Sequence, residues 1–187
     1  MSLKVLAVSG SLRTESYNRK ALQIAKKIAT DFGAEVKEID LRELDLPIYD
    51  ADIQAKGLPD SVKKLKAEIE ATDVLLIASP EYNYGISGAR KNVIDWASRE
   101  GNSLDGKVAA IFGASPGIFG TLRGQFQLRQ ILMSLNVFIL PQPHVFIKNA
   151  NDAFNPDGTF VDSKTHEQLK KLIQKTLEFA QKLKNEV

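Results

Sequence analysis

The chain has 187 residues, of which 43% are hydrophobic and 26% are charged, a composition typical of a globular domain that excludes a disordered or fibrous protein. Lysine and arginine total 25 against 23 for aspartate and glutamate, and the formal net charge of +2 is too small to indicate a nucleic-acid partner. With no cysteine and only two histidines, disulfides, thiolate nucleophiles, iron-sulfur clusters and a multi-histidine metal site are excluded, so we expect no metal.

The absence of thiols means that any redox chemistry must belong to a bound cofactor. No run approaches the ~18 apolar residues that a membrane helix needs, and the first residues, MSLKVLAVSGS, lack the long apolar stretch of a secretory signal. We therefore expect a cytoplasmic protein with no membrane partner. The length predicts a single domain spanning residues 1–187.

Five short apolar runs predict strands, and five amphipathic segments alternate with them and predict helices. The strands are expected at residues 3–8, 35–39, 73–78, 107–112 and 137–140, and the helices at residues 18–32, 61–71, 89–98, 122–135 and 164–184. Most strands are continuously apolar (VLLIA, VAAIF, VFIL), which is typical of a parallel sheet covered on both faces.

Because parallel neighbours need right-handed helical crossovers, the alternation predicts an α/β fold. We expect a flavodoxin-like doubly wound sandwich, with a five-stranded parallel sheet of order 2-1-3-4-5 and helices on both faces. Residues 46–59 and 148–162 are rich in Asn, Asp, Pro and Gly and are expected to be surface loops.

In such sheets ligands bind beyond the carboxyl ends of the strands, and the segment after the first strand is rich in hydrogen-bond donors. This segment, GSLRTESYN, matches neither GxGxxG nor GxxxxGK[ST], which disfavours a pyrophosphate cradle and a P-loop. Its Ser11, Ser16 and Asn18 side chains, the Arg13 guanidinium and a helix N-terminus suit a terminal phosphate dianion. The alternative is that Ser16 or Asn18 only caps the helix.

The segments after the third and fourth strands are also unusual. Residues 79–92 include Pro80, Glu81, Tyr82 and Asn83, and they could form a partly apolar lip whose amides bind the edge of a flat ring. The alternative is a turn whose tyrosines cap the core. Residues 113–121 contain Ser115, Gly117 and Gly120, where backbone can approach a ligand, and Thr121, a candidate helix cap.

Strands 1, 3 and 4 adjoin in the expected order, so all three segments should meet at one edge of the sheet. Phosphate donors beside a site for a flat ring predict a mononucleotide. In a redox protein without thiols, this combination points to FMN.

Three segments carry a family resemblance: GSLRTESYN at 10–18, SPEYNYGISGARKNVIDW at 79–96 and ASPGIFGTLRGQFQLRQIL at 114–132. Together they resemble the NADPH-dependent FMN reductase family, in particular its soluble quinone, chromate and azo-dye reductases. The resemblance spans residues 3–147, and the last helix adds little to it.

The resemblance implies a role for each cofactor-binding candidate. Ser11, Arg13, Ser16 and Asn18 would hold the FMN phosphate. Pro80, Glu81, Tyr82 and Asn83 would contact the isoalloxazine and ribityl chain, and Ser115 would close the far side together with backbone groups near Gly117.

The resemblance also implies a ping-pong cycle, in which NADPH or NADH reduces the flavin, leaves, and is replaced at the same face by a small acceptor such as a quinone, free flavin, azo dye or chromate. No side chain is required as an acid or base, so we name no catalytic residue. A homodimer or homotetramer is implied, with the helix at residues 121–135, including Arg123 and Arg129, and Tyr84 as candidate interface groups. The alternative is that this helix only covers the sheet.

Two other functions fit the same fold. A flavodoxin-type electron carrier would hold FMN and serve a protein partner, but such carriers are typically strongly acidic, and this chain carries a charge of +2. A non-catalytic nucleotide-binding module is the third possibility, because fold alone does not determine function. His144 is expected to be a structural or interface residue, and Arg13, Arg90 and Lys91 are alternatives for contacting the 2′-phosphate of NADPH.

Overall fold

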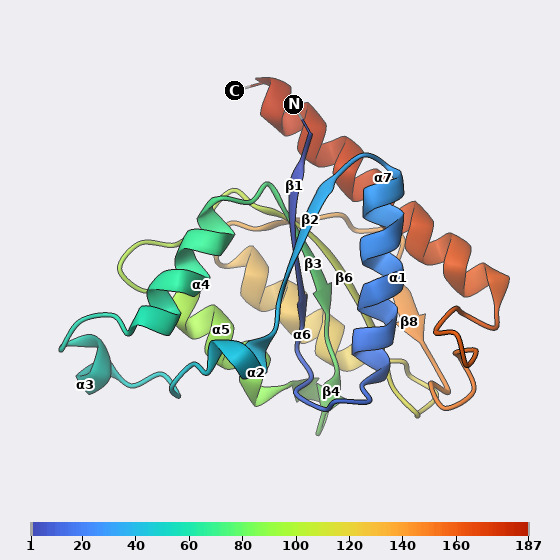
Figure 1. Cartoon of the computed structure of the whole chain (residues 1–187), viewed down its shortest axis with the longest axis horizontal. Helices are drawn as coiled ribbons and strands as arrows, with labels where there is room; N and C mark the ends of the chain where they lie inside the picture. The colour runs from blue at the N-terminus through green and yellow to red at the C-terminus, as the bar shows by residue number, and fades with distance from the viewer. Residues whose placement is uncertain (1, 187) are drawn as a thin grey trace.

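The computed structural model describes residues 2–186 and contains a parallel sheet covered by helices on both faces (Figure 1). Its strands are β1 (Lys4–Ser9), β2 (Glu35–Ile39), β3 (Val74–Ala78), β6 (Val108–Ala114), β7 (Phe138–Ile139) and β8 (Val145–Ile147). The order is β2-β1-β3-β6-β7, with β8 also paired to β6, and every one of these pairings is parallel. The predicted α/β fold and its strand order are confirmed.

The fifth strand differs from the prediction of one run at residues 137–140. It is split into β7, which pairs with β6 near Val108, and β8, which pairs with the other end of β6 near Phe112. Pro141 and Pro143 lie between the two pieces, and proline has no N–H to donate to a ladder. The prediction therefore missed β8 because the prolines interrupt the apolar run.

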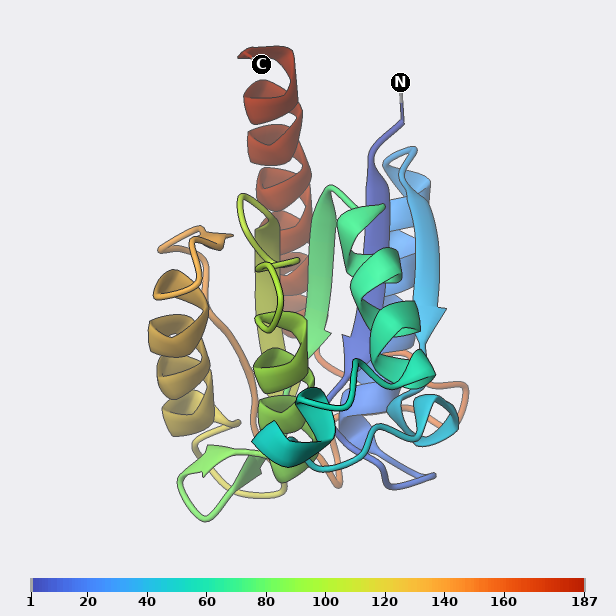
Figure 2. The same cartoon turned by 90° about the vertical axis from the view of Figure 1, so that its left-hand side faces the viewer.

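The five main helices begin and end within two residues of the predicted positions. They are α1 (Tyr17–Asp31), α4 (Asp60–Glu70), α5 (Gly88–Ala97), α6 (Leu122–Met133) and α7 (Ser163–Glu186). Helices α1 and α7 pack on one face of the sheet, and α4, α5 and α6 pack on the other, as the two views in Figures 1 and 2 show. No helix between residues 2 and 186 combines the length and apolarity needed to cross a membrane.

Four further short elements were not predicted. Helices α2 (Leu41–Leu44) and α3 (Ala51–Gln54) begin after Asp40 and Asp50, whose carboxylates accept hydrogen bonds from backbone N–H groups two residues later. Strands β4 (Glu81–Tyr82) and β5 (Gly85–Ile86) form an antiparallel hairpin after β3. Elements this short lack the apolar period that reveals the longer ones.

A buried lysine closes the end of α5. The Lys66 ammonium donates to the carbonyl oxygens of Ala97, Arg99 and Gly101 at 3.3, 2.8 and 2.7 Å. The carbonyls at a helix C-terminus have no partner within the helix, and Lys66 binds one of them, that of Ala97, together with two carbonyls of the segment that follows α5. Burial lowers the pKa of Lys66, and the nearby Glu70 and Glu100 oppose that shift.

Replacing Lys66 by methionine tests this contact. We expect Lys66→Met to lower the free energy of unfolding by about 1–3 kcal/mol, because buried carbonyls lose their charged donor. Urea denaturation of the variant and of the control Lys64→Met, an exposed lysine on the same helix, measures the effect. Equal stability of the two variants would contradict the assignment.

Candidate functional site

The segments that follow β1, β3 and β6 meet at the carboxyl edge of the sheet, at the bottom of Figure 1. The Gly10 N–H donates to the Ala78 carbonyl at 2.8 Å, and the Ser87 hydroxyl donates to the Gly10 carbonyl at 2.6 Å. The Ser79 N–H donates to the Phe112 carbonyl at 2.9 Å. Three segments far apart in the sequence therefore form one continuous surface.

The first segment keeps its polar groups close to the helix that follows. Ser11 is buried, and its hydroxyl accepts the Arg13 N–H at 3.3 Å. Ser16 is the N-cap of α1, since its hydroxyl accepts the Arg19 N–H at 3.4 Å. The alternative that Ser16 caps the helix is therefore correct for this residue. Arg13 itself is exposed, with its guanidinium 5.8 Å from the centre of the Tyr17 ring.

Asn18 joins the first segment to the third. Its side-chain amide donates to the Ala114 carbonyl and accepts the Ala114 N–H, both at 2.9 Å. Asn18 is buried and is not the cap of α1. The two hydrogen bonds with Ala114 position the end of β6 against α1. The predicted contact of Asn18 with a phosphate stays a prediction.

The second segment forms a tight hairpin that presents its tyrosines to solvent. Asn83 and Tyr84 have φ angles of 50° and 68°, and two successive left-handed residues are typical of a type I′ turn. The side chains of Tyr82 and Tyr84 are 53% and 70% exposed. The alternative that these tyrosines cap the core is therefore wrong.

Glu81 fastens the hairpin to α6. Its carboxylate accepts the Gly124 N–H at 2.9 Å and lies 3.5 Å from the Arg123 guanidinium. A carboxylate is favourable at a helix N-terminus, where backbone N–H groups are unpaired. Gln127 adds a second link by accepting the Ile86 N–H at 2.8 Å. No local pattern in the sequence indicates either bond, because the partners are more than 40 residues apart.

The third segment approaches the second without room for a side chain. A Cβ atom added to Gly113 would lie 2.3 Å from both the Ser79 carbonyl oxygen and the Thr121 hydroxyl. Half-buried Ser115 uses its backbone to bind Ile147 and Ala150, whereas Gly117 is exposed. The expectation that Thr121 caps α6 is wrong: its φ is 69°, and its hydroxyl accepts the Gln125 amide instead of a backbone N–H.

Arg90 is a buried positive charge directly behind the first segment. It is 2% exposed, its guanidinium donates to the Val8 carbonyl at 2.9 Å, and its Nε has no partner within residues 2–186. A Cβ atom on Gly10 would lie 3.3 Å from that Nε. Burial lowers the pKa of Arg90 to about 10, so the group remains charged at neutral pH. Because it is buried, Arg90 cannot reach the 2′-phosphate of an external nucleotide.

Beside this edge lies an apolar surface, which we call the α6 face. The Arg123 guanidinium lies 3.9 Å from the centre of the Phe119 ring and 4.1 Å from that of Tyr84. Its exposed apolar side chains are Tyr82, Tyr84, Ile118, Phe119, Phe126 and Met133. The α6 helix therefore covers the sheet with one side and leaves large side chains uncovered on the other.

The chain is similar to known proteins over most of its length. The model of the family described as NADPH-dependent FMN reductase matches residues 3–152. An NAD(P)H-dependent FMN reductase of Pseudomonas aeruginosa is 44% identical over 173 residues, covering 92% of each chain. A quinone reductase of Escherichia coli is 35% identical over 185 residues, covering 97% of each. The solved structure of FerB, an NAD(P)H:(acceptor) oxidoreductase from Paracoccus denitrificans, is 34% identical with a TM-score of 0.86, covering 96% of this chain and 98% of its own.

His144 lies at the border of the α6 face. Its ring stacks on Phe146 at 5.3 Å between centroids and lies 5.4 Å from Phe126, and its Nδ1 has no partner within the described residues. Burial, and secondly the positive charge of Arg129, lower the pKa of His144 below its ordinary value.

This pKa shift predicts a pH dependence of stability. A histidine whose pKa is lower in the folded chain binds fewer protons there, so the free energy of unfolding falls as the pH drops below about 6.5. We expect His144→Asn to lose less stability than the parent chain between about pH 7 and pH 5. Thermal unfolding at a series of pH values measures this, and identical profiles for the two proteins would contradict it.

Proposed function

Because this chain belongs to the NADPH-dependent FMN reductase family, we propose that it transfers hydride from NADPH or NADH through bound FMN to small acceptors. The predictions of an oxidoreductase, of FMN and of NAD(P)H are confirmed by the family. The acceptor class is the proposal, with quinones first, since a relative from Escherichia coli is named a quinone reductase and one from Solanum tuberosum an NAD(P)H:quinone oxidoreductase. Free flavin, azo dyes and chromate follow as further candidates.

The observation that carries the proposal is the meeting of three predicted ligand segments at one edge of the sheet. The first segment presents the buried Ser11 hydroxyl, the exposed Arg13 guanidinium and the N-terminus of α1, which together suit a phosphate dianion. Arg90 adds a buried positive charge behind the same loop. The residues present therefore fit the phosphate end of FMN.

The other two segments fit a flat ring. Pro80, Glu81, Tyr82 and Asn83 would line one side, with Ser115 and Gly117 on the other. Bound FMN would supply the hydride chemistry, and the protein would orient the ring and limit access of water. Donor and acceptor would occupy one face in turn, which is a ping-pong order, and the proposal needs no catalytic acid or base from this chain.

The carrier alternative finds no comparable support. A flavodoxin-type carrier relies on charge for docking to a protein partner, and a net charge of +2 is unsuited to the usual acidic surface. The proposed enzyme is cytoplasmic, with neither nucleic acid nor membrane as a partner.

We also propose that the chain forms a homodimer or homotetramer through the α6 face. Phe126 and Met133 are 51% and 66% exposed on one helix, beside the similarly exposed Tyr84 and Ile118. A cluster of large exposed apolar side chains is typical of a protein interface. A second copy of this chain would cover it close to the proposed flavin site.

The first experiment is a visible spectrum of the protein reconstituted with FMN and then mixed anaerobically with NADPH or NADH. We expect flavin bands near ~375 and ~450 nm that the nicotinamide bleaches, and reoxidation by a quinone in a second mixing step. Bands that the nicotinamide leaves unchanged would favour an electron carrier, and failure to bind FMN would overturn the site.

The phosphate assignment has a separate test. We expect the double variant Ser11→Ala and Arg13→Ala to bind FMN about tenfold more weakly, because a charged donor and a hydroxyl are lost. Riboflavin, which has the same ring and no phosphate, is the matched ligand and should bind parent and variant equally. Fluorescence titration measures the affinity of both proteins for each ligand. An equal loss of affinity for FMN and riboflavin would indicate a distorted loop and contradict the phosphate assignment.

If the α6 face is the interface, a charge placed on it should lower the mass of the oligomer. Phe126→Glu should shift the protein toward monomers, since a charge would be buried against the apolar side chains of a second copy. Analytical ultracentrifugation of this variant and of the control Lys164→Glu, an exposed residue of α7, measures the effect. An unchanged mass would show that the copies meet elsewhere.

A further inference from the structure

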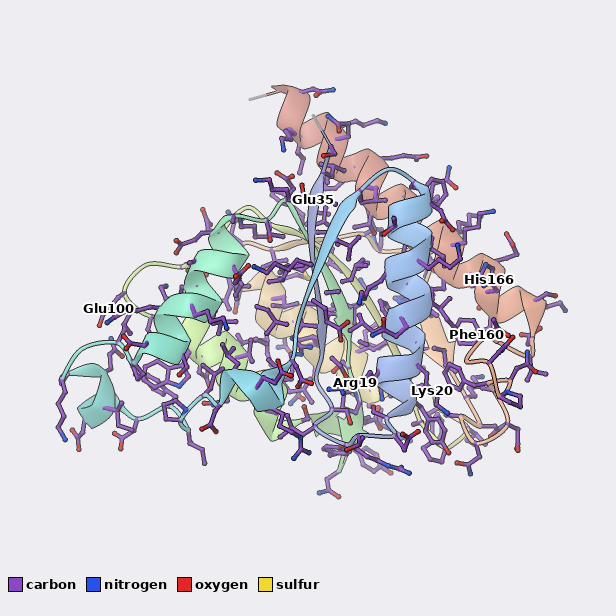
Figure 3. The ribbon with its side chains drawn as sticks, in the orientation of Figure 1. Arg19, Lys20, Glu35, Glu100, Phe160 and His166 are labelled. Atoms are coloured by element: carbon purple, nitrogen blue, oxygen red, sulfur yellow. The ribbon has the colours of Figure 1, made fainter. Side chains whose placement is uncertain are left out.

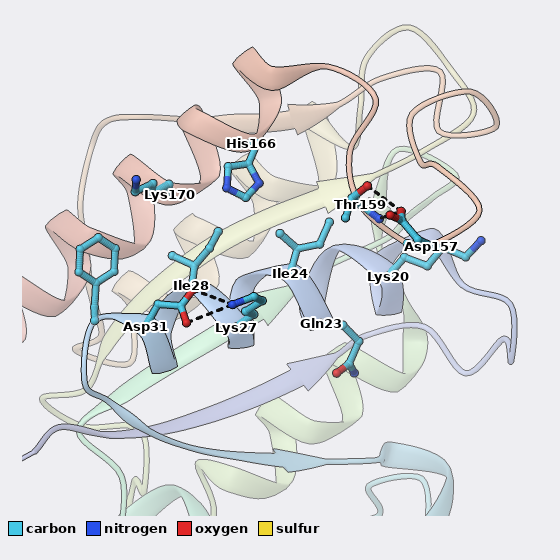
Figure 4. Close-up of a pocket in the computed structure, with 12 residues that line it drawn as sticks. Lys20, Gln23, Ile24, Lys27, Ile28, Asp31, Asp157, Thr159, His166 and Lys170 are labelled. Atoms are coloured by element: carbon cyan, nitrogen blue, oxygen red, sulfur yellow. Dashed lines mark hydrogen bonds and ion pairs between the residues drawn. The ribbon is translucent and has the colours of Figure 1, made fainter.

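A second candidate binding region lies on the other face of the molecule, between α1, α7 and the turn at residues 157–159 (Figure 4). This groove has a volume of about 730 Å³, which is within the range of about 300–1,000 Å³ typical of small-molecule sites. Figure 3 shows Lys20 at one end of α1 and His166 on the neighbouring α7. None of the residues that line the groove is among those expected to bind FMN.

The floor of the groove is apolar. Ile24 and Ile28 lie one turn apart on α1, and Phe32, directly after that helix, is 43% exposed at the end of the same row. The His166 ring extends from α7 toward these isoleucines (Figure 4). A flat apolar body could therefore bury its surface against residues from both helices.

The rim carries an excess of positive charge. It contains three lysines, Lys20, Lys27 and Lys170, against two aspartates, Asp31 and Asp157. Lys27 is paired with Asp31 at 3.0 Å. Within residues 2–186, neither Lys20 nor Lys170 has a carboxylate partner within 4.0 Å, so two ammonium groups of the rim are without a counter-charge.

The two free lysines are not equivalent. Asp157 lines the end of the groove near Lys20, and its carboxylate accepts hydrogen bonds from the N–H and hydroxyl of Thr159 at 2.9 and 2.7 Å. Lys170 extends from α7 toward the other end, where Asp31, the lining carboxylate that the described residues place there, is already paired with Lys27 (Figure 4). An anion is therefore favoured beside Lys170.

We propose that this groove binds an amphipathic organic monoanion, with a flat apolar body on Ile24, Ile28 and Phe32 and a single carboxylate or sulfonate beside Lys170. The three lysines and two aspartates of the lining leave one positive charge, which matches one negative charge on the ligand. This site is separate from the flavin site and does not depend on the proposed redox function.

Calorimetric titration of the full chain with naphthalene-2-sulfonate tests the proposal, with saturating FMN present so that a flavin site is already filled. We expect one saturable site per chain. Lys170→Glu should weaken binding about tenfold, because the cation beside the anion is reversed. Lys171→Glu makes the same change of charge at an adjacent exposed position outside the groove and should change the affinity less than about twofold.

The body of the ligand is tested separately. Ile24→Gln should also weaken binding, and neutral 2-naphthol should bind the parent chain more weakly than the sulfonate. The proposal is overturned by equal losses in the two lysine variants or by no saturable binding up to about 1 mM in the presence of FMN. It is also overturned if the probe binds the FMN-free chain and is displaced when FMN is then added. A fall in mass when the probe is added would also overturn the proposal, because it would mean that the probe displaces a second copy of the chain from the groove.

Discussion

The close approach of the backbones that follow β3 and β6 is the constraint on which the proposed site depends. At Gly113 even a methyl group would overlap the Ser79 carbonyl and the Thr121 hydroxyl, each at 2.3 Å. The next residue, Ala114, is held by both polar atoms of Asn18, and Gly10 is bound to the end of β3. Hydrogen bonds and the absence of a single Cβ thus bring the three segments into one surface before any ligand is present.

Arg90 gives this surface an electrostatic asymmetry. A buried guanidinium without a carboxylate is unfavourable, because its desolvation is not offset by a nearby negative charge. Its position under Gly10 places that charge on the protein side of the loop proposed to bind a phosphate. A negative ligand on the outer side would offset part of the cost, and binding of such a ligand would then stabilise the fold through this residue.

The main strands and helices were predictable because continuous apolar runs and a 3.6-residue period are local properties of the sequence. The fifth strand was predicted only in part, since Pro141 and Pro143 interrupt it, and β8 is too short to stand out. Residue types in the site were informative, but contacts such as Glu81 with Gly124 and Asn18 with Ala114 join distant positions whose spacing carries no signal. The exposure of Tyr82 and the failure of the Thr121 side chain to cap α6 likewise depend on how the segments pack together.

The turns at Asn83, Tyr84, Gly120 and Thr121 all have positive φ angles, and the side chains of Tyr84 and Thr121 disfavour this conformation. Left-handed geometry costs of the order of 1–3 kcal/mol at such residues and persists only where the surrounding structure imposes it. The loss of backbone entropy at these turns therefore occurs when the sheet folds, and a ligand meets amides that are already fixed. The stability of the core thus supplies the rigidity of the edge proposed to bind FMN, and the chain cannot relax these turns without making that edge less ordered.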